Sequence, residues 1–487
     1  MRFITAHPEM LSPEAVEQCY MAGIEGVPWK TTNTLVESEL VVESGTQESG
    51  NLFIAWPTKN HGKLMLLTGS LVPREAAYAL EVELARGTVH RLRQYIALGR
   101  LESIPIPPRV SNLLEEATLL CGQAVTRQDD PPHAADPALE SIERSLEAIE
   151  DLACWDGGEL LRLRLNQQDA SNILIGFTSS DQLAPEAMPE SLAGACNMSN
   201  VPLCWKTLCP DDETFDPQSP RAQFDWCEQH DMKVMAGPII SFQQGNLPDW
   251  LNAGQVDFPA LQSECRAFTS QCVKQFKDHV HLWHATSGMN RILDMTLSEE
   301  QSVRLAIDTV EVIRRHDQQT PVIVSFQQPW GEYLSRHSRD LSPIHFADTL
   351  VRADLGINGI GLEINWQHAL GSTRPRDLVA FANELDRWTL LQMPLVIFLS
   401  APSGLPDESD VYFANHVEQL LTVMLGRPSV QVVVWTQLQD SPEDLPGRAG
   451  LLDSAGREKP LLEVFQHISG QLRTSPVSLE PDQERED

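Results

Sequence analysis

Two glutamates in the second half of the chain follow short apolar runs and could do acid–base chemistry. Glu332 lies in QQPWGEYL, just after the run PVIVSF, and Glu363 lies near the end of the run INGIGLEI. General acid–base catalysis needs one group that gives a proton and one that accepts it, and carboxyl groups do both. We predict Glu332 and Glu363 as a catalytic pair, or as one catalytic acid with a binding partner. The alternative is that Glu332 anchors its loop and Glu363 holds a neighbouring Arg, Lys or Trp.

Large aromatic and polar residues occur at the ends of the same apolar runs. The flat apolar face of a tryptophan stacks on a sugar ring, and the indole N–H can reach a hydroxyl. The alternative for the tryptophans is that they fill the core or cover loops. We predict a substrate-binding set that consists of Trp205, Lys206, Gln243, Gln328, Trp330, Asn365, Trp366 and Trp435.

The elements that must position these residues are eight strand-like runs, each followed by a helical segment. Short apolar strands that alternate with amphipathic helices are typical of parallel βα units, and eight units in about 300 residues fit one α/β protein fold, the (β/α)8 TIM barrel. Such a barrel carries its functional residues at the carboxyl ends of its strands. The barrel is predicted for residues 171–470, with strands at Ile173–Phe177, Asn200–Trp205, Lys233–Phe242, Val280–Ser287, Pro321–Phe326, Ile357–Ile364, Pro394–Ser400 and Val430–Thr436.

Several stretches of this region carry a family resemblance. They are WCEQHDMKVMAGPIISFQQGNLPDWL at the third run, VHLWHATSGMN at the fourth, INGIGLEINW at the sixth, and VVVWTQLQDS with GLLDSAGREKPLLEVF at the end. Their order and spacing, from Ile173 to about Phe465, resemble glycoside hydrolase family 10, the β-1,4-xylanase family. The resemblance implies a TIM barrel and a carbohydrate ligand.

The chain departs from the family at the positions of the two catalytic glutamates. These end strands four and seven, where this chain has Ser287-Gly288 and Phe398-Leu399. Retaining glycosidases need two carboxyl groups about 5–5.5 Å apart, so the family mechanism cannot be carried over. Glu363 stands where the family has a glutamine. Two predictions remain open: a glycoside hydrolase-like enzyme with relocated acids, and a catalytically inactive carbohydrate-binding pseudoenzyme.

The first 170 residues show a different pattern from the predicted barrel. Residues 1–84 hold short β-type runs separated by Gly and Ser turns, which predict a β-sandwich-like domain. This domain is either a carbohydrate-binding module or a scaffold that packs on the barrel. Residues 85–170 are predicted as a helical connector, and residues 471–487 lack apolar periodicity and are predicted as a disordered acidic tail.

Composition and missing motifs narrow the function classes. Acidic residues outnumber basic ones 68 to 36 and give a net charge of −32, which repels nucleic-acid phosphates and anionic membranes. No apolar run approaches the length of a membrane span. The start shows no signal-peptide pattern, and the nine cysteines are irregularly spaced, so we expect free thiols and a cytoplasmic protein.

Metal and cofactor chemistry has little support in the sequence. The stretch DHVHLWH is rich in histidine, but His281 and His284 would point to opposite faces of a strand. No phosphate-binding, dinucleotide-binding or zinc-protease motif is present. We therefore predict no metal and no cofactor, and the sequence does not indicate an oligomeric state.

Overall fold

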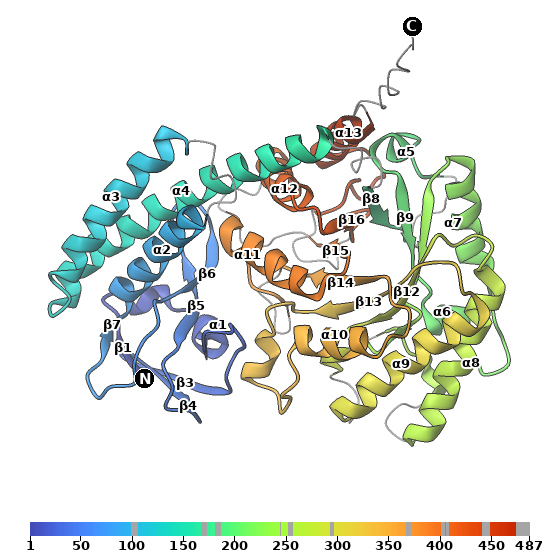
Figure 1. Ribbon diagram of the computed structural model, residues 1–487, viewed down its shortest axis with the longest axis horizontal. Helices are drawn as coiled ribbons and strands as arrows, with labels where there is room; N and C mark the ends of the chain where they lie inside the picture. The colour runs from blue at the N-terminus through green and yellow to red at the C-terminus, as the bar shows by residue number, and fades with distance from the viewer. Residues whose placement is uncertain are drawn as a thin grey trace, which may run out of the picture.

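The computed structural model describes residues 1–98, 106–166, 173–180, 187–243, 245–251, 257–292, 297–366, 372–400, 405, 409–440 and 449–473. The described chain forms an N-terminal part of strands and helices beside a barrel (Figure 1), and the long helix α4 (Pro131–Asn166) runs from one to the other. Residues 474–487, most of the predicted acidic tail, lie outside the described residues.

Eight parallel strands form the closed barrel, which confirms the predicted (β/α)8 fold. Around the barrel, β9 pairs with β8, β8 with β16, and the remaining strands follow in order back to β12, which pairs with β10 and closes the circle. A short ninth strand, β11 (Ile240–Ser241), extends β10 and also pairs with β12. The eight strands are β8 (Leu174–Thr178), β9 (Met198–Val201), β10 (Lys233–Ala236), β12 (Leu282–Ser287), β13 (Val322–Gln327), β14 (Gly359–Ile364), β15 (Leu395–Leu399) and β16 (Val430–Trp435).

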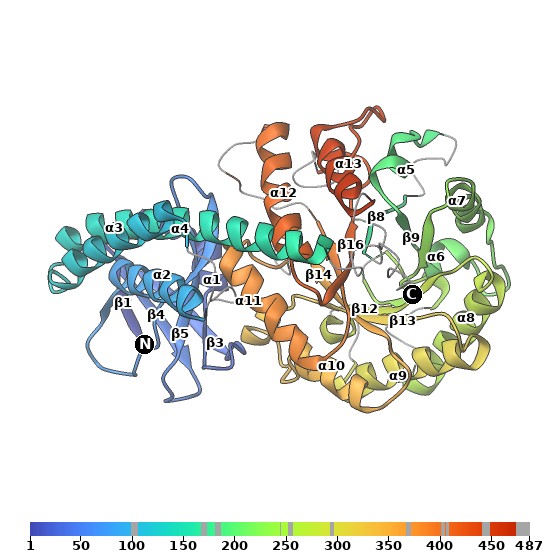
Figure 2. The ribbon, with the colours of Figure 1, turned by 45° about the horizontal axis from the view of Figure 1, so that its top comes forward.

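Helices surround the barrel on its outside (Figure 2). Helix α9 illustrates why they form: Ser298 and Gln301 make a capping box at its start, and the face that includes Leu305 and Ile313 is buried. The helices of the barrel region are α5 (Ser191–Ala195), α6 (Trp205–Leu208), α7 (Gln218–Gln229), α8 (Phe258–Phe276), α9 (Glu299–His316), α10 (Pro343–Arg352), α11 (Leu378–Trp388), α12 (Asp410–Leu425) and α13 (Pro460–Arg473).

Two strands differ from their predicted runs. The second ends at Val201, and Trp205, predicted at a strand end, is instead the first residue of α6. The third run is interrupted at Gly237, which has φ 129°. A Cβ on Gly237 would lie 2.2 Å from the carbonyl oxygen of His284, so only glycine fits where this strand passes β12.

Each strand places alternate side chains in the barrel lumen and under the outer helices. The lumen is filled below the strand ends by Met198, Met235, Ile323, Val396, Phe398, Val432 and Val434. Phe398, near the end of β15, and Ser400, just after it, line the cavity at the top of this layer, whereas Leu399 belongs to the outer core. A glutamate at position 399 would therefore point toward the helices, and neither Phe398 nor Ser400 is a carboxylate.

Two small sheets precede the barrel. One has the order β3 (Thr31–Val36), β4 (Glu39–Ser44), β1 (Arg2–Ile4) and β7 (Tyr78–Ala79), and the other the order β2 (Tyr20–Ala22), β5 (Asn51–Pro57) and β6 (Lys63–Leu67). A short helix, α1 (Pro13–Gln18), lies between β1 and β2. The sandwich assignment and the domain limits stay predictions.

Helices join these sheets to the barrel. The end of the region predicted to be β-type, residues 80–84, is helical instead, because its Leu and Glu residues favour helix and begin α2 (Leu80–Ala97). Next come α3 (Pro108–Val125) and α4, and α4 packs on α11 and α12. The Arg164 side chain on α4 donates to the carbonyl oxygens of Leu425, at 2.9 Å, and Arg427, at 3.0 Å. The N-terminal part is thus fixed to the barrel by polar contacts.

Three further findings concern metals, thiols and membranes. All nine cysteines are free. Within the described ranges, no three His, Cys, Asp or Glu side chains are grouped so as to hold a metal ion. Nor does any described helix have the length and apolar character needed to cross a membrane.

Candidate functional site

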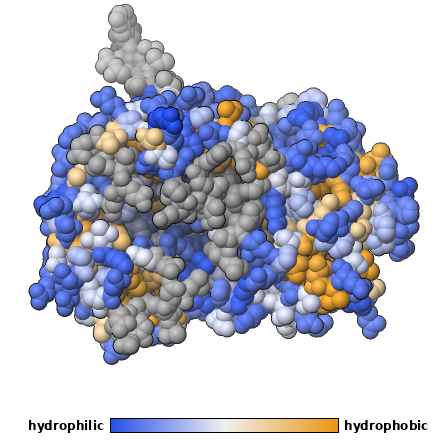
Figure 3. Space-filling view, turned by 180° about the vertical axis from the view of Figure 1, so that it is seen from behind, coloured by the Kyte–Doolittle hydropathy of each residue, from blue (hydrophilic) through white to orange (hydrophobic). Residues whose placement is uncertain are grey.

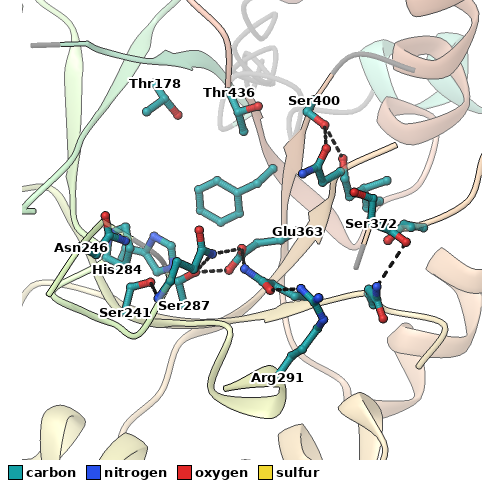
Figure 4. A pocket seen from close by; sticks show the side chains of 18 of the residues that line it. Thr178, Ser241, Asn246, His284, Ser287, Arg291, Glu363, Ser372, Ser400 and Thr436 are labelled. Atoms are coloured by element: carbon teal, nitrogen blue, oxygen red, sulfur yellow. Dashed lines mark hydrogen bonds between the residues drawn. The ribbon is translucent and has the colours of Figure 1, made fainter. Parts of the chain in front are cut away.

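A cavity of about 610 Å³ lies at the carboxyl ends of the barrel strands (Figure 4). Most of the residues that line it are polar, and Phe242, Phe398 and the His284 ring are its aromatic parts. The amides are those of Asn200, Gln243, Asn246, Gln327, Gln328 and Asn365. The hydroxyls include those of Thr178, Ser241, Ser287, Ser372, Ser400 and Thr436. Figure 3 shows a largely hydrophilic surface with a hollow on the barrel side, while apolar residues gather over the N-terminal part.

Glu363 is the one carboxylate among the described residues that line this cavity. Its Oε1 accepts hydrogen bonds from Ser287 Oγ, at 2.6 Å, and from Ser325 Oγ. Its Oε2 accepts from Gln327 Nε2 at 3.2 Å and from Gln243 Nε2 at 3.4 Å. Four donors surround two oxygens, which matches the acceptor-only ionised carboxylate. This arrangement favours a negatively charged Glu363 that accepts hydrogen bonds on both oxygens.

A buried histidine continues the network below Glu363. His284 Nε2 lies 2.7 Å from Ser325 Oγ, and the His284 ring stacks on Phe398 with centroids 4.8 Å apart. When Ser325 donates to the ionised Glu363, His284 Nε2 must carry the proton that it gives to Ser325. A chain of hydrogen bonds therefore runs from His284 through Ser325 to Glu363.

The acid sensitivity of the fold should depend on His284. Burial lowers the pKa of His284 to about 3, from an ordinary 6.5. Between these values the unfolded chain binds a proton that the folded chain does not, so stability falls as the pH is lowered. We expect about 2 kcal/mol to be lost through this residue between pH 8 and pH 5, measured by urea unfolding. His284→Gln, which keeps a donor near Ser325, should reduce this pH dependence, and the part that remains includes buried His416, whose pKa burial lowers to about 4; an unchanged slope would assign the acid sensitivity to other groups.

Arg291 orients one of the four donors. Its NH1 lies 3.4 Å from Gln327 Oε1, while Nε2 of the same amide donates to Glu363. A guanidinium only donates, so this contact fixes which end of the Gln327 amide faces the carboxylate. Arg291 also lines the cavity and provides a positive charge near Glu363.

Four of the predicted site residues come together in the cavity: Glu363, Gln243, Gln328 and Asn365. Asn365 Oδ1 accepts from Ser400 Oγ at 2.8 Å, and Gln328 Nε2 donates to the carbonyl oxygen of Ser372 at 3.2 Å. The roles of these residues stay predictions.

The sequence reasoning missed His284, Ser287, Arg291, Ser325 and Gln327. Two of them had a usable signal. Ser325 and Gln327 follow Ile323 by two and four residues, and Ile323 is part of the lumen layer, so strand alternation places all three on the inner side.

The predicted tryptophans and Lys206 do not line the cavity. Trp435 follows the lumen-facing Val434, so alternation turns it outward, and its Nε1 donates to the carbonyl oxygen of Ala449 at 2.9 Å. Trp205 stacks on Phe268 in the outer core, with centroids 4.7 Å apart. The exposed Lys206 pairs with Asp249 at 2.7 Å.

Trp330, Trp366 and Glu332 lie outside the central cavity as well. Trp366 is 1% exposed and packs edge-on against Phe381. Glu332 Oε1 accepts from Arg376 NH2 at 3.2 Å, and the Arg376 guanidinium lies 4.7 Å from the Trp330 ring centroid. Glu332 and Glu363 therefore do not face each other across one cleft. The ion pair with Arg376 is what the alternative prediction for Glu332, anchoring of its loop, requires.

Comparisons with known proteins give a likeness in structure only. No family model and no curated protein sequence matches the chain. Xylanase 10B from Thermotoga maritima shares 17% identity over 64% of this chain and 98% of its own, with a TM-score of 0.49. Xylanase 10B from Thermotoga petrophila, solved with xylobiose, shares 16% over 64% and 96%, with a TM-score of 0.47. The intracellular xylanase of Thermoanaerobacterium saccharolyticum shares 16% over 60% and 95%, with a TM-score of 0.48. The class of this protein, a (β/α)8 barrel with added N-terminal sheets, follows from its own strand order.

Proposed function

We propose that this barrel binds a carbohydrate in its central cavity. The observation that carries the proposal is the lining, in which the amides and hydroxyls of the described residues surround one carboxylate, Glu363. Amides and hydroxyls both donate and accept hydrogen bonds, as sugar hydroxyls require. A volume of about 610 Å³ is in the usual range of small-molecule sites. The resemblance of the sequence to glycoside hydrolase family 10 supports the same class of ligand.

Within this proposal Glu363 positions the surrounding hydroxyl and amide side chains and accepts a hydrogen bond from the ligand. The contact with Gln243, at 3.4 Å, is the longest of its hydrogen bonds. A ligand hydroxyl can replace Gln243 as a donor to Oε2 at little cost, and the freed Gln243 amide can then bind a second hydroxyl. Glu363 and Gln243 would thus recognise neighbouring hydroxyls of one ring.

Binding without hydrolysis fits the described site best. Glycosidases use two carboxyl groups, and the described lining offers one. Hydrolysis is the second candidate function, and the hydrogen-bonded chain from His284 through Ser325 to Glu363 favours it. That chain would hold the Glu363 carboxyl group in a fixed orientation toward a bound sugar.

A screen of the purified protein against oligosaccharides and aryl β-glycosides tests both candidates. We expect calorimetric binding of at least one sugar, and no hydrolysis of xylan, because the described lining holds one carboxylate where a glycosidase needs two. Xylan turnover at ordinary enzymatic rates, roughly 1–1000 s⁻¹, would contradict the binding proposal and favour the second candidate. Absence of binding to every sugar in the panel would contradict both.

A further inference from the structure

A smaller cavity of about 30 Å³ adjoins the central one and is rich in arginine. The two cavities share Arg291, Gln328 and Ser372. The smaller one is also lined by Arg336 and Arg374. We refer to this space, bounded by Arg291, Arg336 and Arg374, as the arginine annex.

The arginines of the annex face the carboxylates of Glu14, Glu17 and Glu332, but one buried guanidinium N–H has no acceptor within the described part of the chain. Glu332 lines it, but its Oε1 is shared with Arg376, and Arg374 pairs with Glu14 at 3.1 Å. The Nε of Arg336 is buried and has no hydrogen-bond partner among the described residues.

A neighbouring histidine, His337, lies in the positive field of these arginines. The pKa of His337, which also lines the annex, is lowered by burial and then by the charges of Arg291, Arg336 and Arg339. The whole chain carries a net charge of −32 and repels anions at a distance. In so acidic a protein, a cluster of arginines beside the cavity favours a ligand that carries a negatively charged group next to these arginines.

We propose that the ligand of the central cavity is an acidic sugar whose carboxylate enters the arginine annex. This inference rests on the proposed function and names its substrate class, a sugar with a uronic acid group. The planar guanidinium matches a carboxylate through paired hydrogen bonds. The annex, at about 30 Å³, has room for a group of a few atoms, such as the carboxylate at carbon six of a sugar.

The annex is linked to Glu363 through one side chain. Arg291 contacts Gln327 Oε1 at 3.4 Å, and Gln327 Nε2 donates to Glu363 Oε2 at 3.2 Å. The amide separates the ligand carboxylate from Glu363, so the two negative charges need not touch. Glu363 would then bind the hydroxyls of the ring while the arginines bind its acid group.

The N-terminal part of the chain completes the annex. Gln18, the last residue of α1, and Met65, on β6, both line it. Arg374 is held there by Glu14, also on α1. The N-terminal sheets therefore shape the acid-binding end of the site, which gives them a role in recognition.

Matched sugars test the proposal on the full-length protein. D-glucuronic acid and D-glucose differ only at carbon six, as do D-galacturonic acid and D-galactose, and calorimetry would measure the affinity for each. We expect the acid of at least one pair to bind more tightly than its neutral partner. Arg336→Gln should lower this acid-to-neutral affinity ratio at least about tenfold, the scale of hydrogen bonds to charged groups. Arg352→Gln, which removes an exposed positive charge on α10, should leave the ratio unchanged.

The possible outcomes separate the annex from the proposed function. Equal affinities within each pair, or a ratio unaffected by Arg336→Gln, would overturn the annex while leaving carbohydrate binding intact. Tighter binding of glucose 6-phosphate or glucose 6-sulfate than of glucuronic acid would overturn the carboxylate assignment. If neither the acids nor the neutral sugars bind, the proposed function and the annex both fail. Melting temperatures of the variants identify any loss that comes from unfolding.

Discussion

Glu363→Gln is expected to reduce carbohydrate binding at least about tenfold and to destabilise the fold by about 1–3 kcal/mol. Glutamine has nearly the same shape but offers one oxygen where the native side chain offers two. The hydroxyls of Ser287 and Ser325 and the amides of Gln243 and Gln327 all donate to Glu363 in the native protein. In the variant an NH2 group, itself a donor, must face one pair of these donors. The four donor side chains then lose the arrangement in which they would contact the ligand.

Calorimetric titration with the best sugar of the screen gives the affinity, and urea unfolding gives the stability. Glu300→Gln is the matched control, because it makes the same chemical change at an exposed position on α9. The control should bind and unfold like the native protein. A Glu363→Gln protein that melts lower but keeps its full sugar affinity would show that Glu363 is purely structural.

The barrel was predictable because its evidence is local. Each strand is a short apolar run that packs against the neighbouring strands and helices. Its hydrophobic pattern can be recognised from the residues of the run alone, without knowledge of distant parts of the chain. Glu363 was found for the same reason: it interrupts such a run, and alternation turns Leu362 and Ile364 to the outer core. The same alternation, applied to β13 and β16, would have added Ser325 to the predicted site residues and removed Trp435 from them.

Other parts of the site depend on contacts that no local pattern records. Glu332 follows a strand in sequence, yet its surroundings are set by Arg376, which also donates to Tyr20, 356 residues earlier in the chain. The arginine annex likewise needs Gln18 and Met65 from the N-terminal part. A sequence read segment by segment places these residues in separate elements and cannot bring them together.

The buried contacts of Arg376 make it the position at which the largest loss of stability is expected. Its side chain is 1% exposed and that of Glu332 is 10% exposed. Arg376 NH2 donates to Tyr20 at 2.9 Å and to Glu332 at 3.2 Å, and its guanidinium packs near the ring of Trp330. Arg376→Met keeps the length of the side chain but leaves the Glu332 carboxylate buried without its cation. We expect a loss of about 3–5 kcal/mol, as for other broken buried ion pairs.

Urea unfolding followed by tryptophan fluorescence measures this loss, since Trp330 lies at the contact. Adding Glu332→Gln to Arg376→Met should recover part of the stability, because the double variant no longer buries an unpaired charge. Arg352→Met is the control: it breaks an exposed pair with Asp348 and should cost less than about 1 kcal/mol. If Arg376→Met costs no more than this surface control, the junction between the N-terminal sheets and the barrel does not depend on Arg376, and its stability must come from the apolar contacts around it.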